Sequence, residues 1–161
     1  KIFNRNGVDV FQIKLNENLV SQPLVCKSRN KQPFFLQATI ENNIYAFDFR
    51  KRRNIWALRM EDRIMEMKEE ETDYDGNSEI FVLTRNGKLY ILDSRNGAML
   101  TLFDLLHDPE EKVVSNLSLS DMDQDDNLEL ILATDKGNMY KYKLMVLNKK
   151  FILKNLFRMK K

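Results

Sequence analysis

The chain repeats the stretch "EETDYDGNSEIFVLTRNGKLYIL" (residues 70–92) fifty residues later, as "SDMDQDDNLELILATDKGNMYKY" (residues 120–142). The two stretches align without a gap and match at acidic, apolar, threonine, glycine and tyrosine positions. Matches across so many residue types rarely arise by chance. Internal repeats with a period of roughly 20–50 residues indicate solenoids, propellers or other arrays.

Two weaker copies precede this pair. The stretch 34–48 aligns with 79–93 at an offset of 45, and "RNGVDVFQI" (5–13) resembles 85–93. The loop around 28–30, ahead of the first of these copies, has lost the acidic residues, so we expect no metal there. The chain is expected to begin in the middle of a repeat.

Each full copy contains two apolar runs joined by a turn with glycine, such as 79–84 and 88–93. This pattern is a strong signal for a β-hairpin. The runs are apolar at consecutive positions, which is typical of a strand covered on both faces. Further strand candidates flank each hairpin: 23–27, 62–68 and 112–119 upstream, and 54–60, 98–103 and 151–157 downstream. Four strands in roughly 45–50 residues match one blade of a β-propeller.

The sequence therefore predicts an all-β fold, a β-propeller fragment of about three four-stranded blades plus part of a preceding blade. The predicted blades cover about 21–60, 62–105 and 112–157, after a part-blade at 1–20. Propellers close with roughly four to eight blades, so we expect a segment of a larger propeller. The stretch 150–161 fits a basic amphipathic helix or an outer strand, and register with the other blades favours the strand.

Composition excludes several classes of protein. The 161 residues carry a net charge of only +2, which does not favour nucleic acid as a partner. No apolar stretch approaches the roughly 18 residues of a membrane span, so a membrane is expected only indirectly, through a tether outside this segment. Cys26 is the single cysteine, which excludes an internal disulfide and a cysteine-based zinc site. We expect a protein partner, or the missing blades of the same propeller.

The repeated acidic loops are the candidate metal sites. Alternate side chains of a curled loop point to the same side, so their carboxylates converge, and a hard cation such as Ca²⁺ offsets the repulsion. The more regular loop offers Asp121, Asp123, Asp125, Asn127 and Glu129, with Asn127 contributing its backbone carbonyl. The other loop offers Glu71, Asp73, Asp75, Asn77 and Glu79. An EF-hand is excluded, because its bidentate glutamate would fall on Leu132 or Val82, inside predicted strands.

The order D-x-D-x-D-x-x-x-E, apolar strand and glycine hairpin resembles the FG-GAP repeats of integrin α-subunit propellers. It is similar also to the repeats of the T-cell immunomodulatory and defective-in-exine proteins. The resemblance implies structural Ca²⁺ at both sets of loop residues, and a role in adhesion or protein recognition. It also implies a membrane-tethered protein, outside the cell or in the secretory-pathway lumen. Glu71 departs from the usual first aspartate, and Asp126 stands where the turn usually has glycine.

Two alternatives remain open. The hairpin "RNGKLYILDSRNG" (85–97) also resembles quinoprotein blades, which permits an enzyme with a cofactor on the propeller axis. One tryptophan, one histidine and one cysteine offer little catalytic machinery, so we expect no enzyme. The other alternative is a cytoplasmic propeller scaffold of a trafficking-type complex, with the acidic loops free of metal.

Overall fold

The computed structural model describes residues 2–3, 6, 9–27, 33–73 and 75–159. These residues form fourteen strands and no helix, which confirms the all-β prediction. Within the described residues there is consequently no helix long and apolar enough to cross a membrane.

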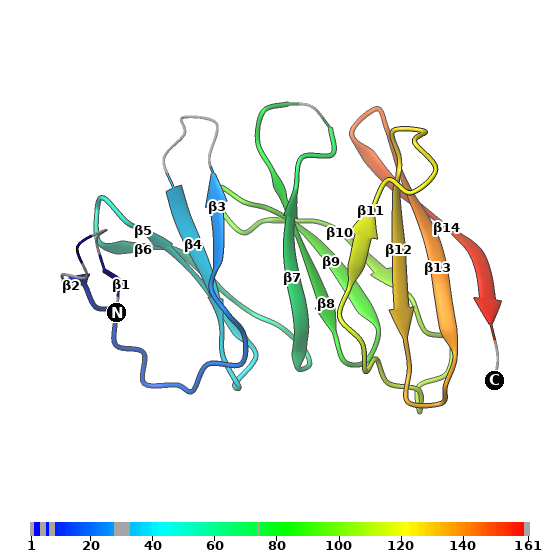
Figure 1. Ribbon diagram of the computed structural model, residues 1–161, viewed down its shortest axis with the longest axis horizontal. Coiled ribbons are helices and arrows are strands. Elements are labelled where there is room, and N and C mark those ends of the chain that lie inside the picture. Colours follow the sequence, from blue (N-terminus) through cyan, green and yellow to red (C-terminus); the bar gives the residue numbers. More distant parts are fainter. Residues whose placement is uncertain (1, 4–5, 7–8, 28–32, 74, 160–161) are drawn as a thin grey trace.

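Twelve strands build three four-stranded antiparallel sheets, here called the first, second and third blades, which stand side by side in Figure 1. The first blade contains β3 (Leu24–Lys27), β4 (Pro33–Ala38), β5 (Asn43–Asp48) and β6 (Arg53–Arg59). The second contains β7 (Ile64–Glu70), β8 (Glu79–Thr84), β9 (Lys88–Asp93) and β10 (Met99–Asp104). The third contains β11 (Ser118–Ser120), β12 (Leu128–Ala133), β13 (Met139–Leu147) and β14 (Lys150–Met159).

Strands pair in sequence order within every blade, as consecutive hairpins require. The stretch at the end of the chain is a strand, because β14 pairs with β13 from Lys150 to Met159. Ahead of the first blade, β1 (Ile2–Phe3) and β2 (Asp9–Phe11) form a separate antiparallel pair.

The hydrophobic core consists of two layers of side chains between the blades. The layer between the first and second blades is here called the first seam, and the layer between the second and third blades the second seam. Every residue of β8 is buried, because alternate side chains of this strand enter different seams. Ile80 and Val82 pack toward the first blade, whereas Phe81 and Leu83 pack toward the third. The consecutive apolar run predicted for a strand with both faces covered is thus confirmed.

Trp56 fastens the first seam. Its ring is buried, and its Nε1 donates a hydrogen bond to the carbonyl of Ser94, 3.0 Å away in the second blade. Gly97, with a φ of +72°, lies so close that a Cβ there would be 2.7 Å from the indole ring. The only tryptophan therefore reports directly on the contact between these two blades.

The inner strand of the third blade is shorter than the predicted 112–119. Only β11 and an isolated bridge from Val113 to Thr134 are formed. Between them, the backbone N–H of Ala133 donates to the hydroxyl of Ser115 at 2.8 Å. A side-chain oxygen thus takes the place of a backbone carbonyl, and this interrupts the ladder.

Candidate functional site

Two acidic loops, 71–79 and 121–129, lie at the same end of adjacent blades, after β7 and β11 (Figure 1). The structure brings three of the four predicted carboxylates of each loop together, and Glu79 and Asp125 are not among them. In loop 71–79, one oxygen each of Glu71, Asp73 and Asp75 lies within 4.8 Å of the others. In loop 121–129 the same holds for Asp121, Asp123 and Glu129. The predicted convergence is therefore observed for three carboxylates of each loop.

The first acidic residue of each loop shapes the turn. Glu71 accepts a hydrogen bond from the backbone N–H of Gly76 at 2.9 Å, and Asp121 accepts one from Asp126 at 3.0 Å. Gly76 and Asp126 both adopt the left-handed backbone, with φ of +83° and +64°. Asp126 thus takes the conformation that the other loop assigns to glycine, and the two loops share this hydrogen bond.

The last glutamate of each loop is buried and holds the loop to its strand. Glu79, 5% exposed, accepts the backbone N–H of Thr72 at 2.9 Å through Oε2. Glu129, 0% exposed, accepts a hydrogen bond from the backbone N–H of Met122 at 2.8 Å, also through Oε2. One carboxylate oxygen of each glutamate is thus committed to the loop backbone.

The loop asparagines orient the neighbouring aspartates. Asn77 donates to Asp75 Oδ1 from its backbone N–H and from its side-chain amide, both at 2.8 Å. Asn127 donates its backbone N–H to Asp125 Oδ1 and its amide to the Asp125 carbonyl, both at 3.1 Å. The carboxylates of Asp75 and Asp125 are therefore fixed before any ligand binds.

A lysine lies among the carboxylates of loop 121–129. Lys143 pairs with Glu129 across the β12–β13 ladder. Its Nζ lies 2.8 Å from Asp123 Oδ2 and 3.4 Å from Glu129 Oε1, and it also forms an ion pair with Asp125. Three of the five predicted ligands thus share one ammonium group. Sequence reasoning missed this residue.

Loop 71–79 has a different neighbour at the matching ladder position. There Glu79 pairs with Asp93, and the guanidinium of Arg95 binds Asp93. Among the residues that the structure describes, no lysine or arginine nitrogen lies within 4.0 Å of the loop 71–79 carboxylates. This loop therefore concentrates negative charge without a compensating ion pair.

The pKa directions differ from one loop carboxylate to the next. Burial raises the pKa of Glu79, and the nearby charges of Asp73 and Glu71 raise it further. In the other loop, the hydrogen bond from Lys143 lowers the pKa of Asp125 to about 2. Ionisation is thus disfavoured at Glu79 and favoured at Asp125, and it is favoured also at Asp75, whose pKa is lowered by its hydrogen bonds with Asn77.

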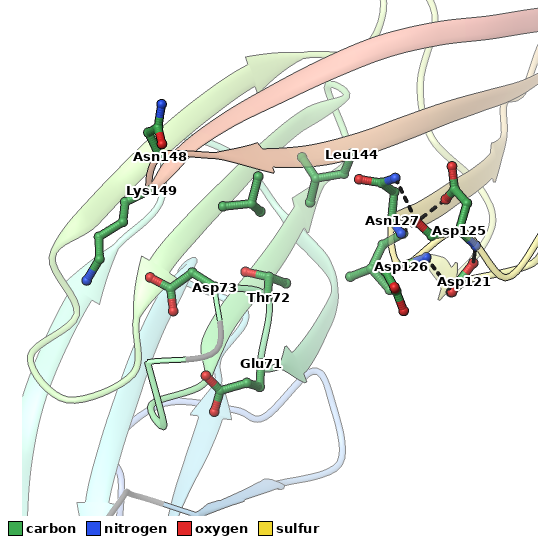
Figure 2. Close-up of a pocket in the computed structure, with 12 residues that line it drawn as sticks. Glu71, Thr72, Asp73, Asp121, Asp125, Asp126, Asn127, Leu144, Asn148 and Lys149 are labelled. Carbon is green, nitrogen blue, oxygen red and sulfur yellow. Dashed lines mark hydrogen bonds between the residues drawn. The ribbon is translucent and has the colours of Figure 1, made fainter.

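A cavity of about 570 Å³ separates the two loops, and Figure 2 shows the side chains around it. Apolar side chains of the third blade, Leu128, Leu144 and Val146, line part of it. Lys149, at the β13–β14 turn, lines it beside Asp73 (Figure 2). The remaining lining residues are Glu71, Thr72, Asp121, Asp125, Asp126, Asn127 and Asn148. The five carboxylates of this lining suit a cation or a basic side chain.

A second repeated cluster, at the opposite end of the blades, was also missed. Glu111, 1% exposed, accepts hydrogen bonds from Thr134, Asn138 and Tyr140, the last at 2.8 Å. The first blade repeats the cluster with Glu17, Thr39, Asn43 and Tyr45. The repeated Thr and Tyr were visible in the alignment, and a glutamate at a nearly constant distance upstream would have completed the signal.

The second blade departs from this cluster. Its equivalent residue, Glu61, has a side chain that is 65% exposed and forms an ion pair with Lys88. Tyr90 is buried, and its hydroxyl has no hydrogen-bond partner among the described residues. The described residues therefore form this glutamate cluster in the first and third blades and not in the second.

Comparison with solved structures supports the propeller fold. The chain is similar to one in the complex of the fission yeast SREBP–SCAP binding domains, with a TM-score of 0.60 and 13% identity, over 96% of this chain and 40% of that one. It is also similar to quinohemoprotein alcohol dehydrogenase from Comamonas testosteroni, with a TM-score of 0.61 and 10% identity, over 89% of this chain and 21% of that one. Kluyveromyces lactis Hsv2 is a third similar structure, with a TM-score of 0.52 and 13% identity, over 84% of this chain and 46% of that one. The chain thus spans less than half the length of these proteins.

No protein-family model and no curated protein matches the chain. At these identities the structural neighbours establish the fold alone.

Proposed function

We propose that the chain is part of a non-enzymatic β-propeller that serves protein–protein interaction or adhesion, with structural Ca²⁺ in at least one of its acidic loops. The observation that carries this proposal is the pair of similarly folded acidic loops on adjacent blades, at either side of one cavity. A role in protein interaction is supported by the SREBP–SCAP complex, in which a propeller with a similar fold binds another protein.

Loop 71–79 fits Ca²⁺ by its donor set. Ca²⁺ takes about six to eight oxygen ligands in flexible geometry, and this loop offers clustered carboxylates together with backbone carbonyls. Glu71, Asp73 and Asp75 would hold the ion, with the free oxygen of Glu79 beside them. Bound Ca²⁺ would offset their mutual repulsion and fix the loop. A protein outside the cell or in the secretory-pathway lumen, where Ca²⁺ is abundant, would suit a weak site of this kind.

A thermal melt of the full chain tests the metal role. The melting temperature is expected to rise when chelator is replaced by millimolar Ca²⁺, because an ion that binds only the folded chain stabilises it. Asp73→Asn/Asp75→Asn should lose this rise. Glu41→Gln/Glu110→Gln, which removes two exposed carboxylates elsewhere, should retain it. A wild-type melting temperature that ignores Ca²⁺ would instead favour the metal-free scaffold of a trafficking-type complex.

The enzyme alternative is supported by the structural likeness to the quinohemoprotein dehydrogenase. An ultraviolet–visible spectrum of the purified chain separates the two proposals. A quinone absorbance that co-purifies with the chain would favour the enzyme and contradict the interaction module.

A further inference from the structure

We propose that the ammonium group of Lys143 is the built-in cation of loop 121–129, so that only loop 71–79 depends on Ca²⁺. The part of this inference that concerns loop 71–79 rests on the function proposed above. The part that concerns Lys143 rests on its own contacts.

The contacts place the ammonium where the carboxylates of the third blade converge. Lys143 Nζ lies 2.8 Å from Asp123 and 3.4 Å from Glu129, and it also forms an ion pair with Asp125. Ca²⁺ bound to the same oxygens at about 2.3–2.6 Å would overlap this ammonium group. The two cations are therefore mutually exclusive, and Ca²⁺ could enter only after Lys143 had moved away.

Burial makes the ammonium group necessary. Glu129 is 0% exposed, and its Oε1 has no hydrogen-bond partner among the described residues. A buried carboxylate without a countercharge is strongly destabilising. The Lys143 side chain is itself only 13% exposed, so solvent screens this pairing weakly. The lysine thus satisfies a carboxylate that water cannot reach.

The repeat provides an internal comparison. At the ladder position opposite the last loop glutamate, the third blade has Lys143 and the second has Asp93. Asp93 supplies no cation to loop 71–79, and its own charge is paired with Arg95. The residue at this one position therefore decides whether the loop carries its own cation or takes one from solution.

Isothermal titration calorimetry of the full chain with Ca²⁺ tests the inference. The wild type should bind one ion, which Asp73→Asn/Asp75→Asn abolishes and Asp123→Asn/Asp125→Asn leaves in place. Lys143→Met should bind a second ion, and adding the Asp123→Asn/Asp125→Asn pair should remove it. Lys141→Met is the matched control, because Lys141 lies two residues earlier on the same face of β13, and it should bind like the wild type.

Two results would overturn the inference: loss of a wild-type ion in Asp123→Asn/Asp125→Asn, or no additional ion in folded Lys143→Met. A wild type that binds no ion, beside a Lys143→Met variant that binds one, would support the role of Lys143 and refute Ca²⁺ in loop 71–79. If Lys143→Met does not fold, melts in chelator decide. Asp123→Asn/Asp125→Asn should lower the melting temperature because it breaks the lysine pairing, and an unchanged or higher value would refute that pairing.

Discussion

Glu79 and Glu129 occupy the same place in two blades, yet the charged groups around them differ. Glu79 is buried beside Asp73 and Glu71, which raises its pKa. A carboxyl whose pKa is higher in the folded than in the unfolded chain destabilises the fold increasingly as the pH rises above the ordinary pKa, and fully once the pH exceeds the raised value. Glu129 instead lies beside the ammonium group of Lys143. We therefore expect the neutral isostere to stabilise one loop and to destabilise the other.

In chelator at neutral pH, Glu79→Gln should raise the melting temperature, because it removes a buried charge that has no lysine or arginine partner among the described residues. Glu129→Gln should lower it, because Lys143 loses its innermost carboxylate. The gain from Glu79→Gln should shrink as the pH falls through the raised pKa and disappear below the ordinary pKa of glutamate, about 4.3. Scanning calorimetry across this pH range measures both effects, and melting temperatures that shift in the same direction would contradict the assignment of charges.

At the scale of elements, the turns of the hairpins hold the segments that connect the blades. Glu111 precedes β11 and accepts hydrogen bonds from three residues around the β12–β13 turn. Burial raises the pKa of Glu111, but these hydrogen bonds outweigh burial and lower it overall. The contribution to stability is therefore present above the ordinary pKa of glutamate and is lost as the pH falls through the lowered value.

Glu111→Ala should destabilise the chain by about 2–4 kcal/mol, because buried donors lose their acceptor. Glu61→Ala, at the equivalent exposed position, should cost no more than about 0.5 kcal/mol. Urea unfolding at neutral pH provides both free energies. Equal costs for the two variants would show that the hydrogen bonds around Glu111 contribute nothing beyond those of a surface ion pair.

Gly97→Ala tests the contact between the β9–β10 turn and Trp56. The added Cβ would lie 2.7 Å from the indole ring, on a backbone with a φ of +72°. We expect a loss of about 2–4 kcal/mol from overpacking together with the left-handed backbone, and a shift in tryptophan emission. Exposed Gly137→Ala, with a φ of +75°, isolates the backbone cost and should leave the emission unchanged.

The fold was predictable because its repeat is visible at the level of elements. Hairpin glycines, apolar inner runs and a constant period led to three four-stranded blades, and register with the earlier blades led to the strand β14. The length of β11 was not predictable, because the hydroxyl of Ser115 interrupts the ladder at a position that reads as a strand. Lys143 was missed because the alignment ended one residue before it, and its role depends on the ladder register.

At the scale of the whole molecule, stability depends on the seams between blades. Phe81 is fully buried in the second seam, whereas the aligned Ile131 lies on the face of the third blade that points away from that seam. The same position of the repeat is thus fully buried in the second blade and only partly buried in the third.

Phe81→Ala should cost about 3–5 kcal/mol, as large deletions in protein cores do. Ile131→Ala should cost about 1–2 kcal/mol, because its side chain is only partly buried. Chemical unfolding of both variants checks this difference. A full core penalty at Ile131 would indicate that another unit covers this face in solution.

The position of Trp56 has a consequence for unfolding experiments. Blades that touch only their neighbours can separate one at a time, as in linear repeat proteins. Tryptophan fluorescence would then follow the loss of the first seam, while circular dichroism would follow all strands together. Two unfolding curves with different midpoints would identify an intermediate in which the second and third blades remain joined, and a two-state fit to either curve alone would misjudge the stability of the chain.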